Sequence, residues 1–180
     1  PDGGINYFRS YKYSETCITG MILALLCYFR CGDDRVHRLV EHLLGQQMAD
    51  GGWNCERPRG ATHGSFHTTI SVLEGLQEYA LFHEDRARAI EDAAGRGREF
   101  LLIHRLYRSH RTGEVANPLM TRITFPPRWR YDFLRGLEYF RWVDAPRDER
   151  MSDAIALLRS KQMPDGRWKQ GQNWPGRVFF

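Results

Sequence analysis

The sequence predicts an all-α fold built from repeated pairs of helices, and three observations support this prediction. "QQMADGGWN" at residues 46–54 and "KQMPDGRWK" at 161–169 share the pattern Gln-Met-x-Asp-Gly-x-Trp. An apolar stretch with helical spacing precedes each copy. No segment shows the strict apolar–polar alternation of a half-buried strand.

The spacing of the turn sequences defines a repeat. Asp2-Gly3-Gly4 is followed 48 residues later by Asp50-Gly51-Gly52, and Asp165-Gly166 comes a further 115 residues on. The second step is about twice the first, so a degenerate copy is expected between them. "EFLLIHRLYRSHRTGEV" at 99–115 fits, with Gly113 in the place of the turn glycine. The chain is therefore expected to hold about three periods of roughly 50–60 residues.

An amphipathic helix is expected before each turn. In the first period one apolar stripe follows the spacing i, i+3, i+4, i+7, i+8, formed by Val36, Leu39, Val40, Leu43 and Leu44. This helix should lie on the outside of its repeat.

A second helix is expected after each turn. The segments "SETCITGMILALLCYF", "SFHTTISVLEGLQEY" and "RWRYDFLRGLEYF" align at Leu25, Leu76 and Leu137. Ser14 and Ser65 are natural N-caps, and Pro126-Pro127 predicts the start of the third helix. The first of these helices is apolar nearly all round, so we expect it to be buried on every side.

The repeated motif has a structural interpretation. Its glycines supply a positive φ, and its aspartate can close an Asx-turn. The glutamine can bond free backbone groups at a helix end, and the tryptophan can cover the joint between repeats. The residues assigned to this role are Gln47, Asp50, Trp53, Gln162, Asp165 and Trp168, and both tryptophans are expected to be buried.

Composition narrows the class of protein. The 180 residues suit a single domain spanning 1–180, and no apolar run approaches the ~20 residues of a transmembrane helix. The net charge is +4 with acidic residues spread along the chain, which disfavours a nucleic-acid partner. The four cysteines are expected to be reduced, which favours a cytoplasmic protein.

The Gln-x-x-Asp-Gly-x-Trp motif after a Leu-Leu helix resembles the QW repeats of squalene–hopene and oxidosqualene cyclases. It is also similar to repeats in the β-subunits of protein prenyltransferases. The resemblance covers nearly the whole chain and implies an α/α toroid, in which two rings of helices surround an apolar cavity for isoprenoids. Three periods make about half of such a ring. The chain is then expected to be a segment of a longer domain, or an arc that another chain completes, in the cytoplasm or at a membrane surface.

The resemblance also implies candidate catalytic residues. In hopene-type cyclases an Asp-x-Asp-Asp-Thr-Ala run opens an inner helix and protonates the substrate. Ser14-Glu15-Thr16-Cys17 stands at that position here, so Glu15 is the candidate acid, and the second acid of the motif is missing. His67, at the start of the next inner helix, is the second candidate. The alternative role for Glu15 is a first-turn acid stabilised by the helix dipole.

Prenyltransferases of this type hold zinc through Asp, Cys and His. The nearest set here is Cys55, His63 and His67, but the tight Asp-x-Cys spacing is absent and Asp50 belongs to the turn. We therefore expect no metal or other cofactor, with Zn²⁺ or Mg²⁺ at this set as the weak alternative.

A basic and aromatic region suits a diphosphate. Arginine binds phosphate through two parallel hydrogen bonds, and aromatic faces stabilise cations. The candidate substrate-binding residues are Arg108, Arg111, Arg128, Trp129, Arg130 and Tyr131; the alternative is a solvated helix face in an arginine-rich sequence. If the inner helices run parallel, Glu15, His67 and the segment 128–130 should line one pocket.

These features predict a cyclase- or prenyltransferase-like protein that acts on or binds an isoprenoid, and they favour an enzyme. The alternative is a non-catalytic α/α module that binds a lipid or a protein partner. The missing second acid favours that alternative.

Overall fold

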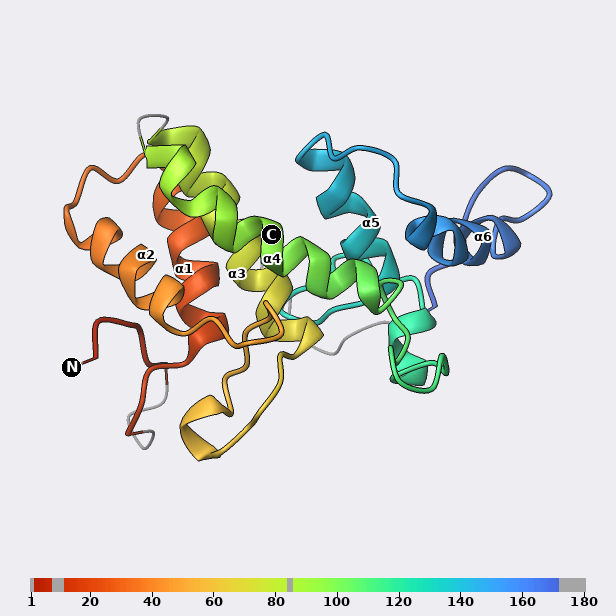
Figure 1. Cartoon of the computed structure of the whole chain (residues 1–180). Coiled ribbons are helices and arrows are strands. Elements are labelled where there is room, and N and C mark those ends of the chain that lie inside the picture. Colours follow the sequence, from red (N-terminus) through yellow and green to blue (C-terminus); the bar gives the residue numbers. More distant parts are fainter. Residues whose placement is uncertain (1, 8–11, 84–85, 172–180) are drawn as a thin grey trace. The chain divides into compact units, whose positions relative to one another are not determined.

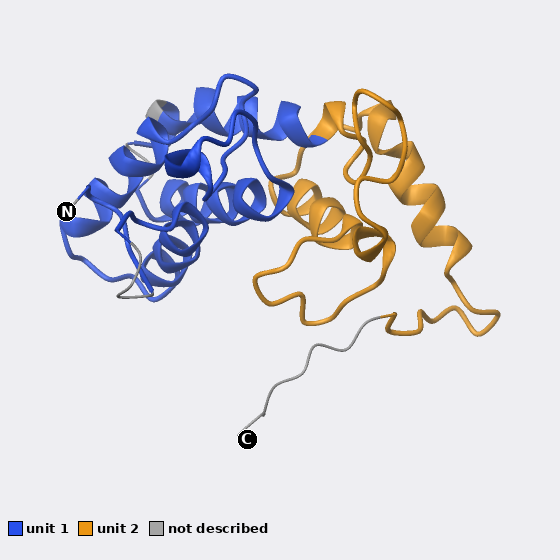
Figure 2. Cartoon of the chain, turned by 90° about the horizontal axis from the view of Figure 1, so that it is seen from below, with its two compact units in different colours: residues 1–101 blue, residues 102–180 orange. Residues whose placement is uncertain are grey.

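The computed structural model describes residues 2–7, 12–83 and 86–171. Across these residues every regular element is a helix and no β-strand forms, which confirms the all-α class. The chain divides into two compact units, residues 1–101 and residues 102–180 (Figures 1 and 2). None of the helices in the described part of the chain is long and apolar enough to cross a membrane.

The first unit is built on two parallel helices in close contact, α1 (Thr16–Tyr28) and α3 (Phe66–Phe82). A Cβ on Gly75 would lie 2.5 Å from the carbonyl oxygen of Gly20, and a Cβ on Gly20 would lie 2.6 Å from that of Ser71. The two backbones therefore approach as closely as glycine allows.

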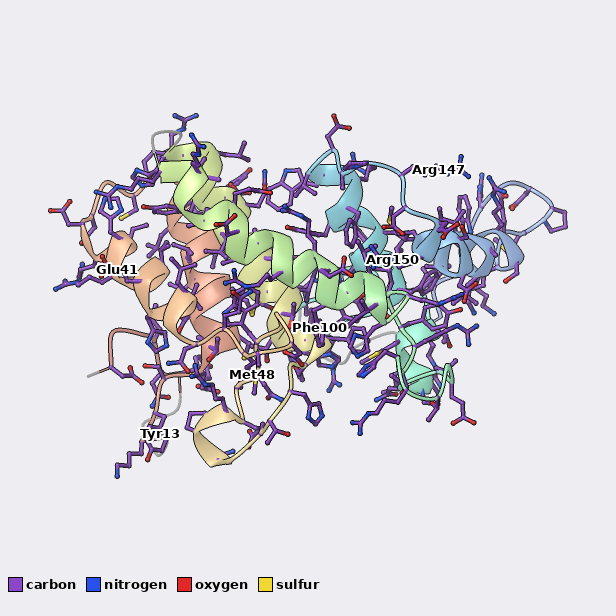
Figure 3. All side chains as sticks on the ribbon, in the orientation of Figure 1. Tyr13, Glu41, Met48, Phe100, Arg147 and Arg150 are labelled. Atoms are coloured by element: carbon purple, nitrogen blue, oxygen red, sulfur yellow. The ribbon has the colours of Figure 1, made fainter. Side chains whose placement is uncertain are left out.

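Two further helices complete the first unit. The amphipathic helix α2 (Arg35–Gly45) packs beside α1, as Figure 1 shows, with the predicted stripe of Val36, Leu39, Val40 and Leu43 buried. Helix α4 (Ala87–Ile103) lies over the second turn and runs on into the start of the second unit. Phe100 of α4, labelled in Figure 3, meets Phe66 of α3 with 5.8 Å between ring centroids.

The three turn sequences adopt the same local geometry. Gly3, Gly51 and Gly166 have φ values of +91°, +84° and +81°, a region that glycine enters without strain. In each turn the aspartate accepts a hydrogen bond from the backbone N–H two residues later: Gly4 on Asp2, Gly52 on Asp50 and Arg167 on Asp165. The predicted Asx-turns are confirmed.

In the first two turns the aspartate also ties the turn to the next helix. The second carboxylate oxygen of Asp2 accepts the N–H of Ser14, and that of Asp50 accepts the N–H of Gly64 at 2.7 Å. Ser14 and Gly64 each stand two residues before the first residue of α1 or α3. In the second turn the motif thus links the end of α2 to the segment that leads into α3.

Two further hydrogen bonds correct the predicted alignment of the helices. Ile5 donates its N–H to the hydroxyl of Thr19, and Trp53 donates its N–H to the hydroxyl of Thr69. Thr19 and Thr69 therefore occupy equivalent positions in the two repeats. This alignment makes Leu25 equivalent to Gly75. The predicted alignment of Leu25 with Leu76 was therefore wrong by one residue. That alignment matched apolar residues, and the apolar pattern does not show which threonine accepts the hydrogen bond.

Helix α1 is not buried on every side, contrary to the prediction. Leu23 and Cys27 are buried, but Leu25, Tyr28 and Phe29 are 52%, 68% and 73% exposed. Helices α2 and α3 pack on α1, and part of its apolar surface stays exposed. Mean hydropathy therefore overstated its burial.

The second unit contains α5 (Phe133–Trp142) and α6 (Ser152–Ser160), with short 3₁₀ turns at Pro118–Thr121 and Glu149–Met151. Helix α5 begins at Phe133, where Asp132 caps it by accepting the N–H of Arg135 at 2.9 Å. The start predicted at Pro126-Pro127 was wrong. Arg128, which follows these prolines, has a φ of +54° and cannot belong to a helix.

The second full copy of the motif and the turn glycine of the degenerate copy also lie in this unit. Gln162 donates to the carbonyl of Gly166 at 2.9 Å, as Gln47 does to Gly51 at 2.8 Å. Gly113 has the positive φ expected of a turn glycine, +71°. Trp53 is fully buried as predicted, but Trp168 is 42% exposed, which contradicts the prediction for that residue.

The difference between the tryptophans has a local cause. A Cβ on Gly97 of α4 would lie 2.7 Å from the Trp53 ring, so α4 is packed directly on this indole. Gln47 reaches the same helix through the carbonyl of Ala93 and the side chain of Arg96. The motif alone does not bury its tryptophan, and a following helix must cover it.

Candidate functional site

The beginnings of α1 and α3 meet at the sulfur of Cys55. The backbone N–H of Cys17, in the first turn of α1, donates to Cys55 Sγ at 3.1 Å. The hydroxyl of Thr68, in the first turn of α3, donates to the same sulfur at 3.5 Å. Cys55 thus joins two helix starts through its side chain, and it is free of any disulfide.

The electrostatics of the two thiols are unequal. The hydrogen bond from the Cys17 thiol, helped by Thr68 and the Cys17 N–H and opposed by burial, lowers the pKa of Cys55 from 9.0 to about 7. The hydrogen bond to Cys55, together with burial, raises the pKa of Cys17. Of the two thiols, Cys55 is therefore the one whose surroundings favour the thiolate.

Glu15 lies beside this sulfur. Glu15 is the N-cap residue of α1, so the predicted N-cap at Ser14 was wrong by one residue. The Glu15 side chain is half-buried, and its Oε2 accepts the N–H of Tyr7 at 3.0 Å. A cavity of about 50 Å³ is lined by Glu15, Cys55, Glu56 and their neighbours Tyr13, Ser14, Pro58 and Arg59. Figure 3 labels Tyr13, on the loop before α1. The structure thus places a second carboxylate, Glu56, near the predicted acid, although Glu56 is paired with Arg59 at 2.9 Å.

The predicted His67 is half-buried and stands at the second position of α3, next to Thr68. His63 is exposed on the loop before α3, and its backbone carbonyl accepts the side-chain N–H of Asn54. Among the residues that the structure describes, no three His, Cys, Asp or Glu side chains are grouped so that they could hold a metal ion. Cys55, His63 and His67 are therefore not brought together as a ligand set.

Arg108 belongs to a basic cluster in the second unit. Its Nε lies 3.0 Å from Asp153 Oδ2, and Arg105 approaches the same oxygen at 3.3 Å. These residues, with His110, line a cavity of about 330 Å³. The Arg108 guanidinium also stacks on the Tyr107 ring, 5.0 Å from its centroid. Two arginines share one carboxylate here, which leaves net positive charge for an anion.

The other predicted substrate-binding residues have different surroundings. Arg111 is exposed, and Arg128 lies in the loop before α5. Trp129 is 48% exposed and carries the Arg130 guanidinium 4.5 Å from its ring centroid. Tyr131 is buried and donates its hydroxyl to the carbonyl of Leu106 at 2.7 Å, and burial raises its pKa. Tyr131 is a core residue of this unit.

A second cavity of the first unit is a groove lined by residues of α2, by Leu26 of α1 and by the segments before and after α1. It has a volume of about 730 Å³. Its apolar wall comes from Ile5, Leu26, Val36 and Leu39, and its polar residues include Cys31, Asp33, Arg35 and Arg38. Asp33 accepts two hydrogen bonds from the Arg35 guanidinium, at 2.8 and 2.6 Å. Sequence reasoning missed this groove, because it depends on how α1 and α2 pack.

Within the first unit the first turns of α1 and α3 both reach Cys55, but His67 is not among the residues that line the cavity at Glu15. The pocket that would add the segment 128–130 stays a prediction. Cys17, Glu56, Arg105 and Asp153 were not singled out from the sequence, and only their spatial neighbours reveal them. Comparisons with protein-family models, with curated proteins and with solved structures find no match to this chain.

Proposed function

We propose that this chain forms part of an α/α toroid that binds an isoprenoid amphiphile, with an apolar tail and an anionic head. The observation that carries the proposal is the shared geometry of the repeated motif. In both full copies the glutamine donates to the glycine carbonyl four residues on, and the indole N–H donates to a leucine carbonyl ten residues back. This is the arrangement expected if the resemblance to QW repeats reflects a common fold.

The groove along α2 is the site we propose for the ligand. Its volume of about 730 Å³ lies within the range of roughly 300–1,000 Å³ for small-molecule sites. Ile5 and Leu26, the half-buried apolar residues of the lining, would pack against a prenyl chain. Arg38, exposed at the groove, would pair with a diphosphate head, which arginine binds through two hydrogen bonds. A location in the cytoplasm or at a membrane surface, and completion of the ring by another chain, belong to the same proposal.

Binding of farnesyl diphosphate and farnesol to the purified chain, followed by calorimetry, tests this proposal. Arg38→Glu should weaken farnesyl diphosphate binding about tenfold or more and leave farnesol nearly unchanged, since only the head group loses a partner. Leu26→Asp should weaken both ligands. Arg88→Glu, an exposed change on α4 away from the groove, is the matched control. Absence of binding, or equal effects of Arg38→Glu and Arg88→Glu, rules the groove out.

The second candidate function is catalysis of the cyclase or prenyltransferase type. Glu15 and Glu56 around one small cavity favour it, because a carboxylic acid beside a second carboxyl can serve as a proton donor. Incubation with farnesyl diphosphate or squalene, followed by product analysis, tests it. Loss of product in Glu15→Gln with ligand binding retained would support catalysis. Binding without any product would leave the chain a binding module.

A further inference from the structure

The cysteine arrangement carries an inference independent of isoprenoid binding. Cys55 Sγ lies 3.1 Å from the backbone nitrogen of Cys17, and with an N–Cα bond of about 1.46 Å the sulfur is within about 4.6 Å of Cys17 Cα. With the Cys55 sulfur this close to the backbone of Cys17, 38 positions away in the sequence, a bond between the two side chains would need little backbone movement.

The surroundings make the two sulfurs chemically different. Cys55 Sγ accepts hydrogen bonds from the Cys17 N–H and the Thr68 hydroxyl, two donors that favour a thiolate. The residue is half-buried and lines the cavity it shares with Glu15, so a small reagent can approach its side chain. Cys17 lies next to Cys55, in the first turn of α1.

We propose that Cys55 and Cys17 form a redox-active thiol pair that low-molecular-weight disulfides of the glutathione type oxidise. The Cys55 thiolate attacks one sulfur of the disulfide, forms a mixed disulfide and releases one thiolate. The Cys17 thiol then gives up its proton, and its sulfur attacks Cys55 Sγ, forming the Cys17–Cys55 bond and releasing the second thiol. Two electrons pass from the pair to the small disulfide, which is reduced to two thiols.

The product has a defined structural effect. The new bond would tie the loop after the Gln47–Trp53 turn to the first turn of α1, at the cavity that contains Glu15. The pair would then sense the thiol–disulfide balance and change the access to that cavity. Because the groove along α2 shares no residue with this cavity, thiol oxidation and isoprenoid binding can fail independently.

Oxidised glutathione added to the full reduced chain, followed by intact mass spectrometry and peptide mapping without reductant, tests the proposal. The expected product lacks two hydrogens and has Cys17 linked to Cys55. In the Cys17→Ser variant the reaction should stop at the mixed disulfide, so that Cys55 keeps one bound glutathione. Cys55→Ser should lose the reaction, while the double variant Cys27→Ser/Cys31→Ser should react as the wild type does.

Two further measurements separate this pair from an ordinary exposed thiol. Alkylation of Cys55 should rise with pH through a midpoint near its pKa of about 7, and Cys31, also half-buried, should react more slowly at neutral pH. Thr68→Val should slow alkylation at neutral pH about two- to tenfold, the effect of one lost hydrogen bond. A main product at Cys31, or a Cys17→Ser protein without a glutathione adduct on Cys55, would overturn the proposal.

Discussion

The indole N–H of Trp53 donates a hydrogen bond to the backbone carbonyl of Leu43 over 2.7 Å, and the ring is completely buried beneath α4. Trp168 makes the corresponding bond to Leu158 over 2.8 Å, but its ring is 42% exposed. The motif therefore makes the same indole hydrogen bond in both copies, but the buried ring of Trp53 should stabilise the fold more than the exposed ring of Trp168. This contrast supplies a matched pair for measurement.

Replacing Trp53 by Ala should lower the free energy of unfolding by about 3–5 kcal/mol, because a large cavity opens between the second turn and α4. Trp168→Ala should cost only about 1–2 kcal/mol, since part of its ring is already in water. Urea unfolding followed by circular dichroism measures both. Equal losses in the two variants would contradict the role of α4 in burying Trp53.

Two glycines of α4 should respond to alanine in opposite directions. A Cβ on Gly97 would lie 2.7 Å from the Trp53 ring and 2.9 Å from Leu73, so Gly97→Ala should destabilise the protein by about 1–3 kcal/mol. A Cβ on Gly95 meets only the end of the Arg98 side chain at 3.8 Å. Gly95→Ala should therefore raise stability by about 1 kcal/mol through helix propensity. Thermal melts of the two variants would show midpoints shifted to opposite sides of the wild type.

The turn aspartates should differ in the same way as the tryptophans. Asp50 accepts N–H groups from Gly52 and Gly64 and so holds both the turn and the approach to α3. Asp50→Ala should cost about 1–3 kcal/mol, because the two donors lose their partner in a half-buried place. Asp165→Ala removes one exposed bond and should cost about 0.5 kcal/mol. A larger loss of stability in Asp165→Ala than in Asp50→Ala would mean that the hydrogen bond from Gly64 to Asp50 contributes nothing to stability.

Asp2 should make folding sensitive to acid. Burial alone would raise its pKa, but hydrogen bonds from Ser14 and Gly4 outweigh burial and lower the pKa to about 2 from 3.8. A carboxyl whose folded pKa is depressed stabilises the fold above the unfolded pKa, and this contribution is lost as pH falls from about 4 to 2. Because Asp2 is exposed, the effect should be below about 1 kcal/mol.

Denaturant midpoints of the wild type and Asp2→Asn, compared between pH 7 and pH 2, measure this term. The difference in denaturant midpoint between the two proteins should be largest at pH 7 and should disappear as the pH falls to 2. A gap that stays constant to pH 2 would mean that the carboxylate charge of Asp2 contributes nothing to stability.

The helical class, the three turns and the amphipathic stripe of α2 could be predicted from the sequence. The turn bonds join residues two to ten positions apart, such as Asp50 to Gly52 and Trp53 to Leu43, so a short motif specifies both partners. Part of the candidate site followed as well. The sequence predicted Glu15 as a candidate acid and Cys55 as a weak candidate metal ligand, and both residues line one cavity.

Only the tertiary structure decided the register of Thr19 against Thr69, the meeting of Cys17 with Cys55, the exposure of Trp168 and the groove along α2. Each depends on which surfaces of separate helices face one another, with partners tens of residues apart. Hydrophobic periodicity says that a helix has an apolar face but not what covers that face. The close approach of Gly20 to Gly75 sets the α1–α3 pairing, and that contact brings both helix starts to the sulfur of Cys55.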